Sequence, residues 1–316
     1  MHTRGEAPER QECVTHAPGS PMYLVTAAEG SAANLIEVLL VRRIASLVCA
    51  TVMAGAAFLT VATAQAQPAC PDYHLIGAAG SGERAGALLA TDAGMGRVIN
   101  KSFTDLASML ASDGHTITAE AVEYPATEVP LDGGILDWAG FMGSVDTGAA
   151  ALGQQYAAFV AQCPTTKVVL AGYSQGAMVV HRNLHALDAS PNLAAALLIA
   201  DGDRLPQDPT LDLGSVTSAP GAGKGVAQDW PTLAHAPAPL PVSMGSRTIS
   251  VCDVGDAVCD YDPDAEDVSP ASVQVHTSYA RSSTGDSWTW GLYKLLGSAT
   301  PVEVPVANQM VVSAGS

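Results

Sequence analysis

Apolar residues along this chain occur in short continuous runs that alternate with longer runs of helical spacing. Continuous apolar runs are typical of strands that are buried on both faces of a sheet. Such runs predict strands at residues 72–78, 116–122, 167–171, 194–200 and 248–251. Helical spacing predicts helices at residues 97–111, 145–160, 176–187 and 286–296. The alternation indicates an α/β fold, in which helices cover both faces of a parallel sheet of about five strands.

Two stretches fall outside this pattern. Residues 205–245 are rich in proline and glycine and have little apolar period, so we expect a long surface insertion rather than a second domain. Residues 41–66 contain two arginines, then an apolar, alanine-rich run, and end in Ala-Gln-Ala. This order is typical of a cleaved signal peptide, although an uncleaved membrane anchor is an alternative for the same run.

The expected signal peptide sets the remaining boundaries. We expect cleavage before Gln67, one domain over residues 67–300 and a C-terminal tail over residues 301–316. Residues 1–40 are either a leader or lie upstream of a true start at Val41. A signal peptide predicts a secreted, extracellular protein, without stable membrane association after cleavage.

Charge narrows the range of partners. The chain has 316 residues and a formal net charge of −17 at pH 7, with a pI near 4.6. An acidic surface repels phosphate backbones and anionic bilayers, so nucleic acid is not an expected partner. Uncharged small molecules, such as neutral esters, remain open as substrates.

Cysteine usage agrees with export. Two of the six cysteines lie before the expected cleavage site. Four remain in the mature chain: Cys70, Cys163, Cys252 and Cys259. An even number of cysteines in an exported chain predicts two disulfides.

Residues 172–176 read Gly-Tyr-Ser-Gln-Gly, between a predicted strand and a predicted helix. This is the G-x-S-x-G pattern of a nucleophile elbow, whose glycines permit a sharp turn that projects the serine above the sheet. The positive N-terminal end of the following helix favours a developing oxyanion. We therefore predict that Ser174 is a nucleophile and not part of a structural turn.

A serine nucleophile needs a histidine base that is oriented by a carboxylate. In this strand–turn–helix class, the acid and then the histidine follow the serine along the chain. His276, after the last predicted strand, is the best candidate for the base, because His235 lies in the proline-rich segment. His181 and His185 lie on the helix directly behind the serine, and we expect both to be solvated.

The acid has two candidate positions. Asp201 or Asp203 follows a predicted strand, whereas Asp256 lies between two cysteines in the run Cys-Asp-Val-Gly-Asp-Ala-Val-Cys. A disulfide between those cysteines would close a small loop and hold Asp256 rigidly, as an orienting acid requires. We therefore favour Asp256.

Taken together, these motifs resemble the cutinases, which are small secreted serine esterases of the α/β-hydrolase type. The resemblance covers roughly residues 69–297 and rests on Gly-Tyr-Ser-Gln-Gly at 172–176, the C-x-x-G-D-x-x-C loop at 252–259 and His276 beyond it. It implies a three-layer α/β-hydrolase-like sandwich without a large lid. It also implies the pairings Cys70–Cys163 and Cys252–Cys259.

The resemblance further implies an activity and a mechanism. Ser174, His276 and Asp256 would form a catalytic triad, with Ser81 and the backbone N–H of Gln175 as the oxyanion hole. The expected activity is hydrolysis of short- or medium-chain esters or polyesters by a monomer that needs no metal or organic cofactor. The alternatives are an acetylxylan esterase or phospholipase-like esterase of the same fold, and a non-catalytic cell-wall or matrix-binding protein.

Two segments depart from the family pattern. One is the insertion at residues 205–245, and the other is the long gap between Asp256 and His276. That gap carries an acidic run that includes Asp260, Asp262 and Asp264. Because the run lacks the glycine of an EF-hand loop, we expect a solvated acidic loop and not a calcium site.

Overall fold

The structure, a computed structural model, describes residues 69–130, 134–219, 221–229, 238–265, 268–281 and 285–298. The expected leader (1–40), signal peptide (41–66) and tail (301–316) lie outside these residues, as does His235. Across the described ranges, no helix is both long enough and apolar enough to cross a membrane.

Within the described residues, six strands form one parallel sheet in the order β2-β1-β3-β4-β6-β5. The strands are β1 (Tyr73–Ala78), β2 (Ile117–Ala121), β3 (Lys167–Tyr173), β4 (Leu193–Ile199), β5 (Leu211–Leu213) and β6 (Thr248–Val251). All except β5 coincide closely with the predicted strands. β5 is a three-residue edge strand within the proline- and glycine-rich segment, so its short apolar run gave no period to detect.

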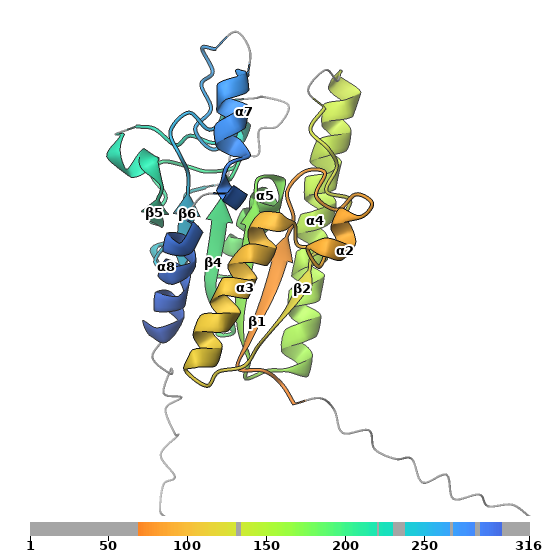
Figure 1. Cartoon of the computed structure of the whole chain (residues 1–316), viewed down its shortest axis with the longest axis vertical. Helices are drawn as coiled ribbons and strands as arrows, with labels where there is room; N and C mark the ends of the chain where they lie inside the picture. Colours follow the sequence, from red (N-terminus) through yellow and green to blue (C-terminus); the bar gives the residue numbers. More distant parts are fainter. Residues whose placement is uncertain are drawn as a thin grey trace, which may run out of the picture. The chain divides into compact units, whose positions relative to one another are not determined.

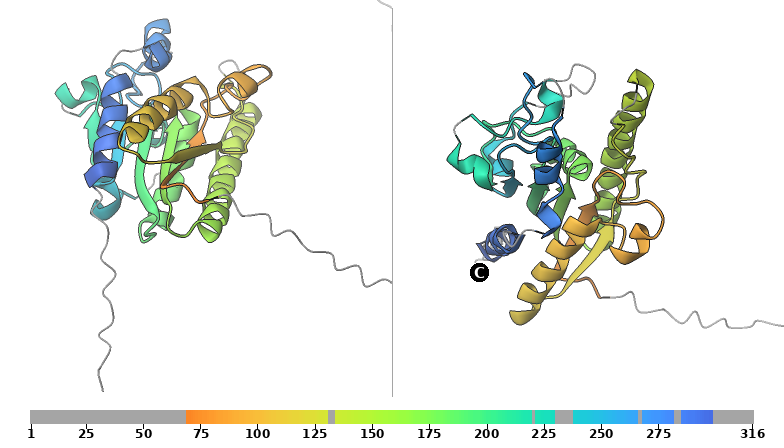
Figure 2. Two further views of the ribbon diagram at one scale, coloured as in Figure 1. Left: turned by 60° about the horizontal axis from the view of Figure 1, so that its bottom comes forward. Right: turned by 45° about the horizontal axis from the view of Figure 1, so that its top comes forward.

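Helices cover both faces of the sheet, as the alternation of elements predicted. They are α2 (Leu88–Thr91), α3 (Arg97–Ser112), α4 (Ile135–Gln162), α5 (Gln175–Leu187), α6 (Val242–Gly245), α7 (Pro270–His276) and α8 (Gly285–Ser298). Helix α3 packs beside α8 on one face, and α4 packs beside α5 on the other (Figures 1 and 2). The result is the expected three-layer α/β sandwich.

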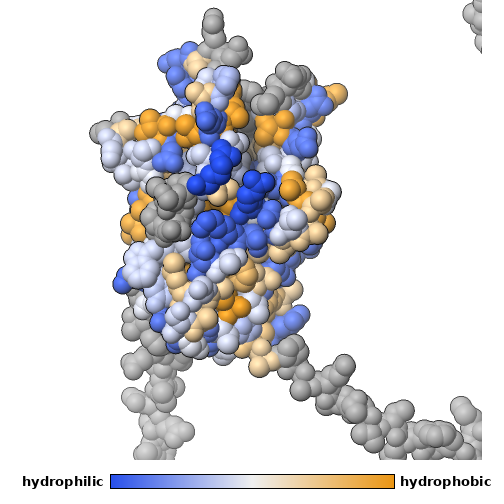
Figure 3. All heavy atoms as spheres, viewed as in Figure 1, coloured by the Kyte–Doolittle hydropathy of each residue, from blue (hydrophilic) through white to orange (hydrophobic). Residues whose placement is uncertain are grey.

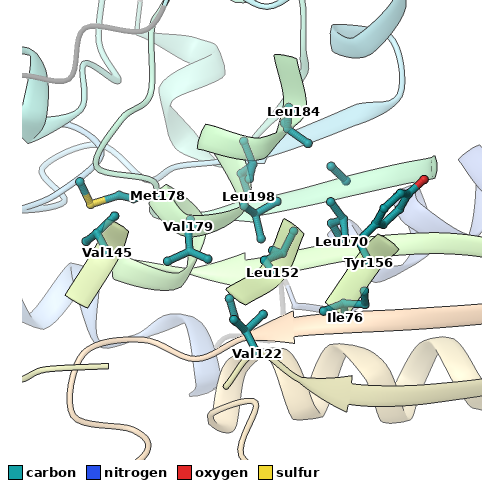
Figure 4. Close-up of a cluster of buried hydrophobic side chains, with 14 of the residues drawn as sticks. Ile76, Val122, Val145, Leu152, Tyr156, Leu170, Met178, Val179, Leu184 and Leu198 are labelled. Atoms are coloured by element: carbon teal, nitrogen blue, oxygen red, sulfur yellow. The ribbon is translucent and has the colours of Figure 1, made fainter. Parts of the chain in front are cut away.

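Side chains of the central strands alternate between the two faces of the sheet and so build two hydrophobic cores. In β1, Leu75 joins the core under α3 and α8, whereas its neighbour Ile76 joins the core under α4 and α5. Figure 4 shows side chains of this second core, among them Ile76, Val145, Leu152, Leu170, Leu184 and Leu198. Because both faces are apolar, the strands read as continuous apolar runs in the sequence.

Helix α4 begins ten residues before its predicted start, at Ile135 in place of residue 145. Asp137 stabilises this start, because its Oδ2 accepts a hydrogen bond from the Gly134 N–H at 2.9 Å. Ile135 and Leu136 are exposed. Apolar residues on the solvent side break the helical period, and for that reason the first turns were not predicted.

The proline- and glycine-rich segment contributes to the domain's cores. It includes β5, α6 and two 3-10 turns, η1 (Ser215–Ser218) and η2 (Val226–Gln228). Several of its apolar residues are buried: Leu205, Val216, Ala227, Leu240 and Met244. Val216 joins the core beneath α8, while Leu240 and Met244 join the core beneath α5. The segment is therefore tied to the sheet at both faces.

The expectation that His181 is solvated is wrong. Its side chain is 1% exposed, and its Nδ1 lies 2.6 Å from Asp201 Oδ2 at the end of β4. Its Nε2 faces Asp208 Oδ2 at 3.7 Å. Burial alone would lower the pKa of His181, but Asp201, with Asp203 and Asp208, raises it to about 9. His181 is thus a buried cation, which carboxylates from the loop after β4 hold in place, whereas His185 is exposed as expected.

This buried cation predicts a fall in stability at alkaline pH. A group whose pKa rises on folding stabilises the fold fully below its unfolded value, about 6.5. That contribution is lost as the pH rises through the pKa of His181 in the folded state, about 9. We expect the free energy of unfolding in urea to fall by about 3 kcal/mol between pH 6 and pH 9.5. His181→Gln should abolish most of this fall, and the exposed control His185→Gln should retain it; an equal fall in His181→Gln contradicts the assignment.

Candidate active site

Ser174 occupies the sharp turn between β3 and α5. Its backbone angles are φ 54° and ψ −120°, in a region that a side chain with a Cβ rarely adopts. Such a conformation costs about 1–3 kcal/mol and persists only where the surroundings enforce it. The turn leads directly into the N-terminal end of α5, so the serine hydroxyl lies at the carboxyl edge of the sheet.

The two glycines of the turn are required by close approach. A Cβ on Gly172 would lie 2.2 Å from the carbonyl oxygen of Gly176. A Cβ on Gly176 would lie 2.2 Å from the carbonyl oxygen of Ala78, the last residue of β1. Both distances are far inside van der Waals contact. The glycines therefore let the elbow close on itself and seat it against the neighbouring strand.

His276 is the last residue of α7 and reaches the serine through its imidazole. Its Nε2 lies 3.0 Å from Ser174 Oγ, and its Nδ1 lies 3.0 and 3.1 Å from the two carboxylate oxygens of Asp256. Since a carboxylate only accepts hydrogen bonds, Nδ1 carries the ring proton and Nε2 is left to accept the serine proton. These three predicted residues, 102 and 20 positions apart along the chain, form one continuous hydrogen-bonded series.

Asp256 is fully buried and is held by its own loop. Its Oδ1 accepts hydrogen bonds from the N–H groups of Val258 at 2.7 Å and Cys259 at 3.0 Å. The Cys252–Cys259 disulfide closes this loop. Burial by itself would raise the pKa of Asp256, but the hydrogen bond and charge of His276, with the two N–H groups, hold that pKa below its ordinary value. Asp256 is therefore ionised and fixed in orientation.

The rival acids have other partners. Asp201 pairs with His181, and Asp203 accepts a hydrogen bond from Arg182 Nε at 2.8 Å. Both side chains are buried in these pairs. The geometry thus brings His276 to Asp256, the acid that we favoured.

Both disulfides have the pairing that the resemblance implied. Cys70 pairs with Cys163, and Cys252 pairs with Cys259. The first bond joins the segment before β1 to the segment before β3, at the opposite edge of the sheet from the serine. The second bond lies at the site itself and constrains the acid.

Ser81 lies in the loop after β1. Its Oγ is buried and has no hydrogen-bond partner within the described part of the chain. A Cβ on its neighbour Gly80 would lie 2.7 Å from the Tyr173 ring, so this loop packs against the residue before the serine. Gln175 begins α5, where the first backbone N–H groups have no acceptor within the helix. The Ser81 hydroxyl and the Gln175 N–H are therefore both available as hydrogen-bond donors.

Glu83 and Tyr124 hold the loop of Ser81 in shape. Glu83 Oε2 accepts a hydrogen bond from the Gly80 N–H at 2.8 Å, and its Oε1 accepts one from the Arg97 N–H at 3.0 Å. Burial raises the pKa of Glu83, and these two N–H groups oppose the rise. The Tyr124 hydroxyl donates to the carbonyl of Ala79. These polar contacts therefore preorganise the loop.

Sequence reasoning missed two tyrosines at the site. The Tyr173 hydroxyl donates to the His276 carbonyl at 2.7 Å, and its ring stacks on the imidazole at 5.3 Å between centroids. The Tyr279 hydroxyl contacts Asp256 Oδ2 at 2.9 Å. Tyr173 stands directly before Ser174, and Tyr279 stands three residues after His276. These two positions are the signals that the sequence offered.

The acidic run after Asp256 is mostly solvated, as expected. Asp262 and Asp264 are exposed. Asp260 has a structural role, because it accepts hydrogen bonds from the N–H groups of Gly223 at 2.6 Å and Gly255 at 2.7 Å. Over the described ranges, no group of three or more His, Cys, Asp or Glu side chains is arranged to hold a metal ion. Residues 266–267 of the run lie outside the residues that the structure describes.

Comparison with known proteins identifies related sequences. A family model described as "Cutinase" matches residues 69–295. A cutinase of Monilinia fructicola is 34% identical over 112 residues, which are 34% of this chain and 50% of that protein. Phospholipase Culp4 of Mycobacterium tuberculosis is 28% identical over 224 residues, which are 69% of this chain and 80% of that protein. The chain thus spans about half the length of the first of these relatives.

Solved structures share the fold. A cutinase-like protein from Cryptococcus sp. superposes with a TM-score of 0.52 at 22% identity, over 73% of this chain and 97% of that one. The superposition shows the shared fold alone, a parallel sheet between two helical layers.

Proposed function

The chain belongs to the cutinase family, and from this premise we propose that it hydrolyses carboxylic esters through an acyl-enzyme intermediate. In this proposal Ser174 is the nucleophile, His276 the general base and acid, and Asp256 the residue that orients the imidazole. Ser81 and the Gln175 N–H bind the oxyanion. The contacts of Ser174, His276 and Asp256 support their roles, and the chemistry that an ester requires supports the oxyanion hole.

The proposed reaction proceeds in two halves. Ser174 Oγ attacks the ester carbonyl while its proton moves to His276 Nε2, and the oxyanion that forms is held by Ser81 and Gln175. The C–O bond to the alcohol then breaks, and His276 gives its proton to the leaving alkoxide. Water then attacks the acyl-serine carbonyl while His276 takes one of its protons. The bond between the acyl carbon and Ser174 Oγ breaks, His276 returns the proton to Ser174 Oγ, and the carboxylic acid leaves.

One observation carries this proposal. The hydrogen-bonded series from Ser174 Oγ through His276 to Asp256 has lengths of 3.0 Å on both sides of the imidazole. These lengths lie within the range for proton transfer in a positioned acid–base pair. The strained backbone of Ser174 supports the same interpretation, since unfavourable conformations cluster at functional residues.

The substrate class that we propose is apolar: short- or medium-chain esters or aliphatic polyesters. Exposed apolar side chains occur on helices that Figure 1 places at the carboxyl end of the sheet: Leu88 and Leu89 on α2, Ile135 and Leu136 at the start of α4, and Val273 on α7. Figure 3 shows hydrophobic atoms at this end of the molecule, among hydrophilic ones. An apolar rim near a catalytic serine favours acyl chains and polymer surfaces over small polar esters.

A phospholipase-like activity is the second candidate, because the mycobacterial relative is named a phospholipase. The net charge of −17 favours neutral esters over anionic phospholipids, since like charges repel. We also propose that the protein is secreted and monomeric. Two disulfides and the signal-peptide pattern support secretion.

The proposed activity is tested by labelling and by a substrate panel. An alkyl phosphonate should form one adduct, on Ser174, and should abolish hydrolysis in proportion to labelling. A panel of acetyl to long-chain p-nitrophenyl esters, a neutral phospholipid and an aliphatic polyester should show highest kcat/KM for short- and medium-chain esters. No hydrolysis of any ester and no adduct on Ser174 contradict the proposal. A preference for phospholipid supports the second candidate.

A further inference from the structure

The carboxylate of Asp256 has a fourth donor besides His276 and the two loop N–H groups. The Tyr279 hydroxyl lies 2.9 Å from Asp256 Oδ2, on the oxygen that the backbone N–H groups do not contact. Tyr279 is 1% exposed, and the carboxyl of Asp256 is fully buried. The contact is therefore shielded from water, which would otherwise compete for the oxygen.

The direction of this hydrogen bond is fixed by a second contact. The Asp253 backbone N–H donates to the Tyr279 oxygen at 3.0 Å. A phenol has a single proton, and an ionised carboxylate can only accept. The proton of Tyr279 must therefore point at Asp256 Oδ2, while its lone pair receives the N–H of Asp253.

We propose that Tyr279 is a positioning residue whose hydroxyl holds Asp256 in the orientation that faces His276. This inference rests on the proposed function, because it assumes that Asp256 and His276 act in ester hydrolysis. With Oδ1 held by the loop and Oδ2 held by Tyr279, the carboxylate cannot rotate about its Cβ–Cγ bond. Both oxygens then stay within 3.1 Å of His276 Nδ1.

One short segment carries both His276, the proposed base, and Tyr279, which donates a hydrogen bond to Asp256. Tyr279 begins the turn η3 (Tyr279–Arg281), three residues after His276 at the end of α7. Its ring packs between Tyr173 and Trp288, each at 6.1 Å between centroids. The Tyr279 hydroxyl therefore couples the position of this segment to the loop of Asp256.

Replacing Tyr279 with phenylalanine changes no formal charge at the site. Burial, and then the charge of Asp256, raise the pKa of Tyr279, so the hydroxyl remains neutral over the pH range of activity. The other ionisable groups near this segment are Asp253, Tyr173, Arg281 and, beyond Tyr173, Glu83. All of them are retained in the variant, so a change in its pH profile reports the loss of one donor.

The test is the pH profile of Tyr279→Phe. We expect kcat/KM on a soluble p-nitrophenyl ester to fall about tenfold to a hundredfold at the optimum. The acid limb of the profile should move to higher pH by about one unit, because a carboxylate with one donor fewer holds the imidazolium proton more tightly. A role in folding alone lowers stability without moving this limb.

A matched control separates these outcomes. Tyr156→Phe removes a hydroxyl from another buried tyrosine, which belongs to α4 on the opposite face of the sheet. That hydroxyl lies 2.5 Å from Ser190 Oγ. This control should keep the acid limb of the native protein. An unmoved limb in Tyr279→Phe, with the native protein active, overturns the inference but leaves the proposed function intact. An inactive native protein contradicts the proposed function itself.

A second substitution keeps the test decisive if Tyr279→Phe does not fold. Incorporating 3,5-difluorotyrosine at position 279 keeps the shape and the hydroxyl but makes the phenol a stronger donor. The acid limb should then move to lower pH, opposite to its movement in Tyr279→Phe. An acid limb that stays at its native pH in this variant contradicts the inference.

Discussion

Ser174→Ala should lower kcat on a soluble ester by about a million-fold, the scale on which a triad nucleophile contributes. Alanine has no Oγ, so no acyl-enzyme can form, and water must attack the carbonyl directly. The proposed donors at Ser81 and Gln175 remain. The residual rate should therefore be about a thousandfold above that of the uncatalysed reaction in water. Because alanine is smaller than serine, the strained backbone at φ 54° meets no new contact.

The measurement is single-turnover and steady-state hydrolysis of a p-nitrophenyl ester, with circular dichroism to confirm folding. Ser102→Ala is the matched control, since Ser102 is also buried and its Oγ accepts a hydrogen bond from Trp288 Nε1 at 3.1 Å. That variant should be slightly less stable and fully active. If Ser174→Ala retained more than about one per cent of native kcat, another nucleophile would have to be sought.

Asp256→Asn should lower kcat by about ten-thousandfold while the fold is kept. The amide can donate to His276 Nδ1, and that contact places the ring proton on Nε2. In that tautomer Nε2 cannot accept the proton of Ser174, although all three side chains remain in place. The loss should be smaller above neutral pH, where hydroxide deprotonates the serine without help from the imidazole.

The control for this variant is Asp201→Asn. It makes the same change in another buried His–Asp pair, in which Asp201 Oδ2 lies 2.6 Å from His181 Nδ1. Since that pair supports the loop after β4 and does not reach Ser174, its loss should lower stability and leave kcat per folded molecule within about threefold of native. Equal losses of kcat in the two variants would unseat Asp256 as the orienting acid.

Most of the sheet could be predicted from sequence because its central strands, such as β3 and β4, are buried on both faces. Five strands were found with nearly their observed bounds, since continuous runs such as residues 167–171 have no competing interpretation. β5 could not be found, because three residues at a sheet edge, Leu211–Leu213, carry no period. The first turns of α4 were missed for the opposite reason: Ile135 and Leu136 are apolar but face solvent.

The candidate site was predictable as far as local motifs reached. Ser174 and Asp256 sit in short patterns that contain their own supports, two glycines for one and two cysteines for the other. Contacts between distant segments that lie outside the motifs and the family resemblance were not predictable. The burial of His181 depends on carboxylates beyond β4, and the hydroxyl of Tyr279 finds Asp256 only after the chain has folded. Such contacts leave no spacing rule in the sequence.

The short helix α7, which presents the His276 imidazole, has few buried apolar side chains to anchor it to the domain. All seven residues of α7 are described, and none of them is fully buried. Its attachment is mainly polar, through the Tyr173 hydroxyl to the His276 carbonyl and the Tyr279 hydroxyl to Asp256. Segments with few buried apolar contacts open with smaller free energies than core strands. Heat should therefore inactivate this protein by detaching its base at temperatures where the central strands still resist amide hydrogen exchange.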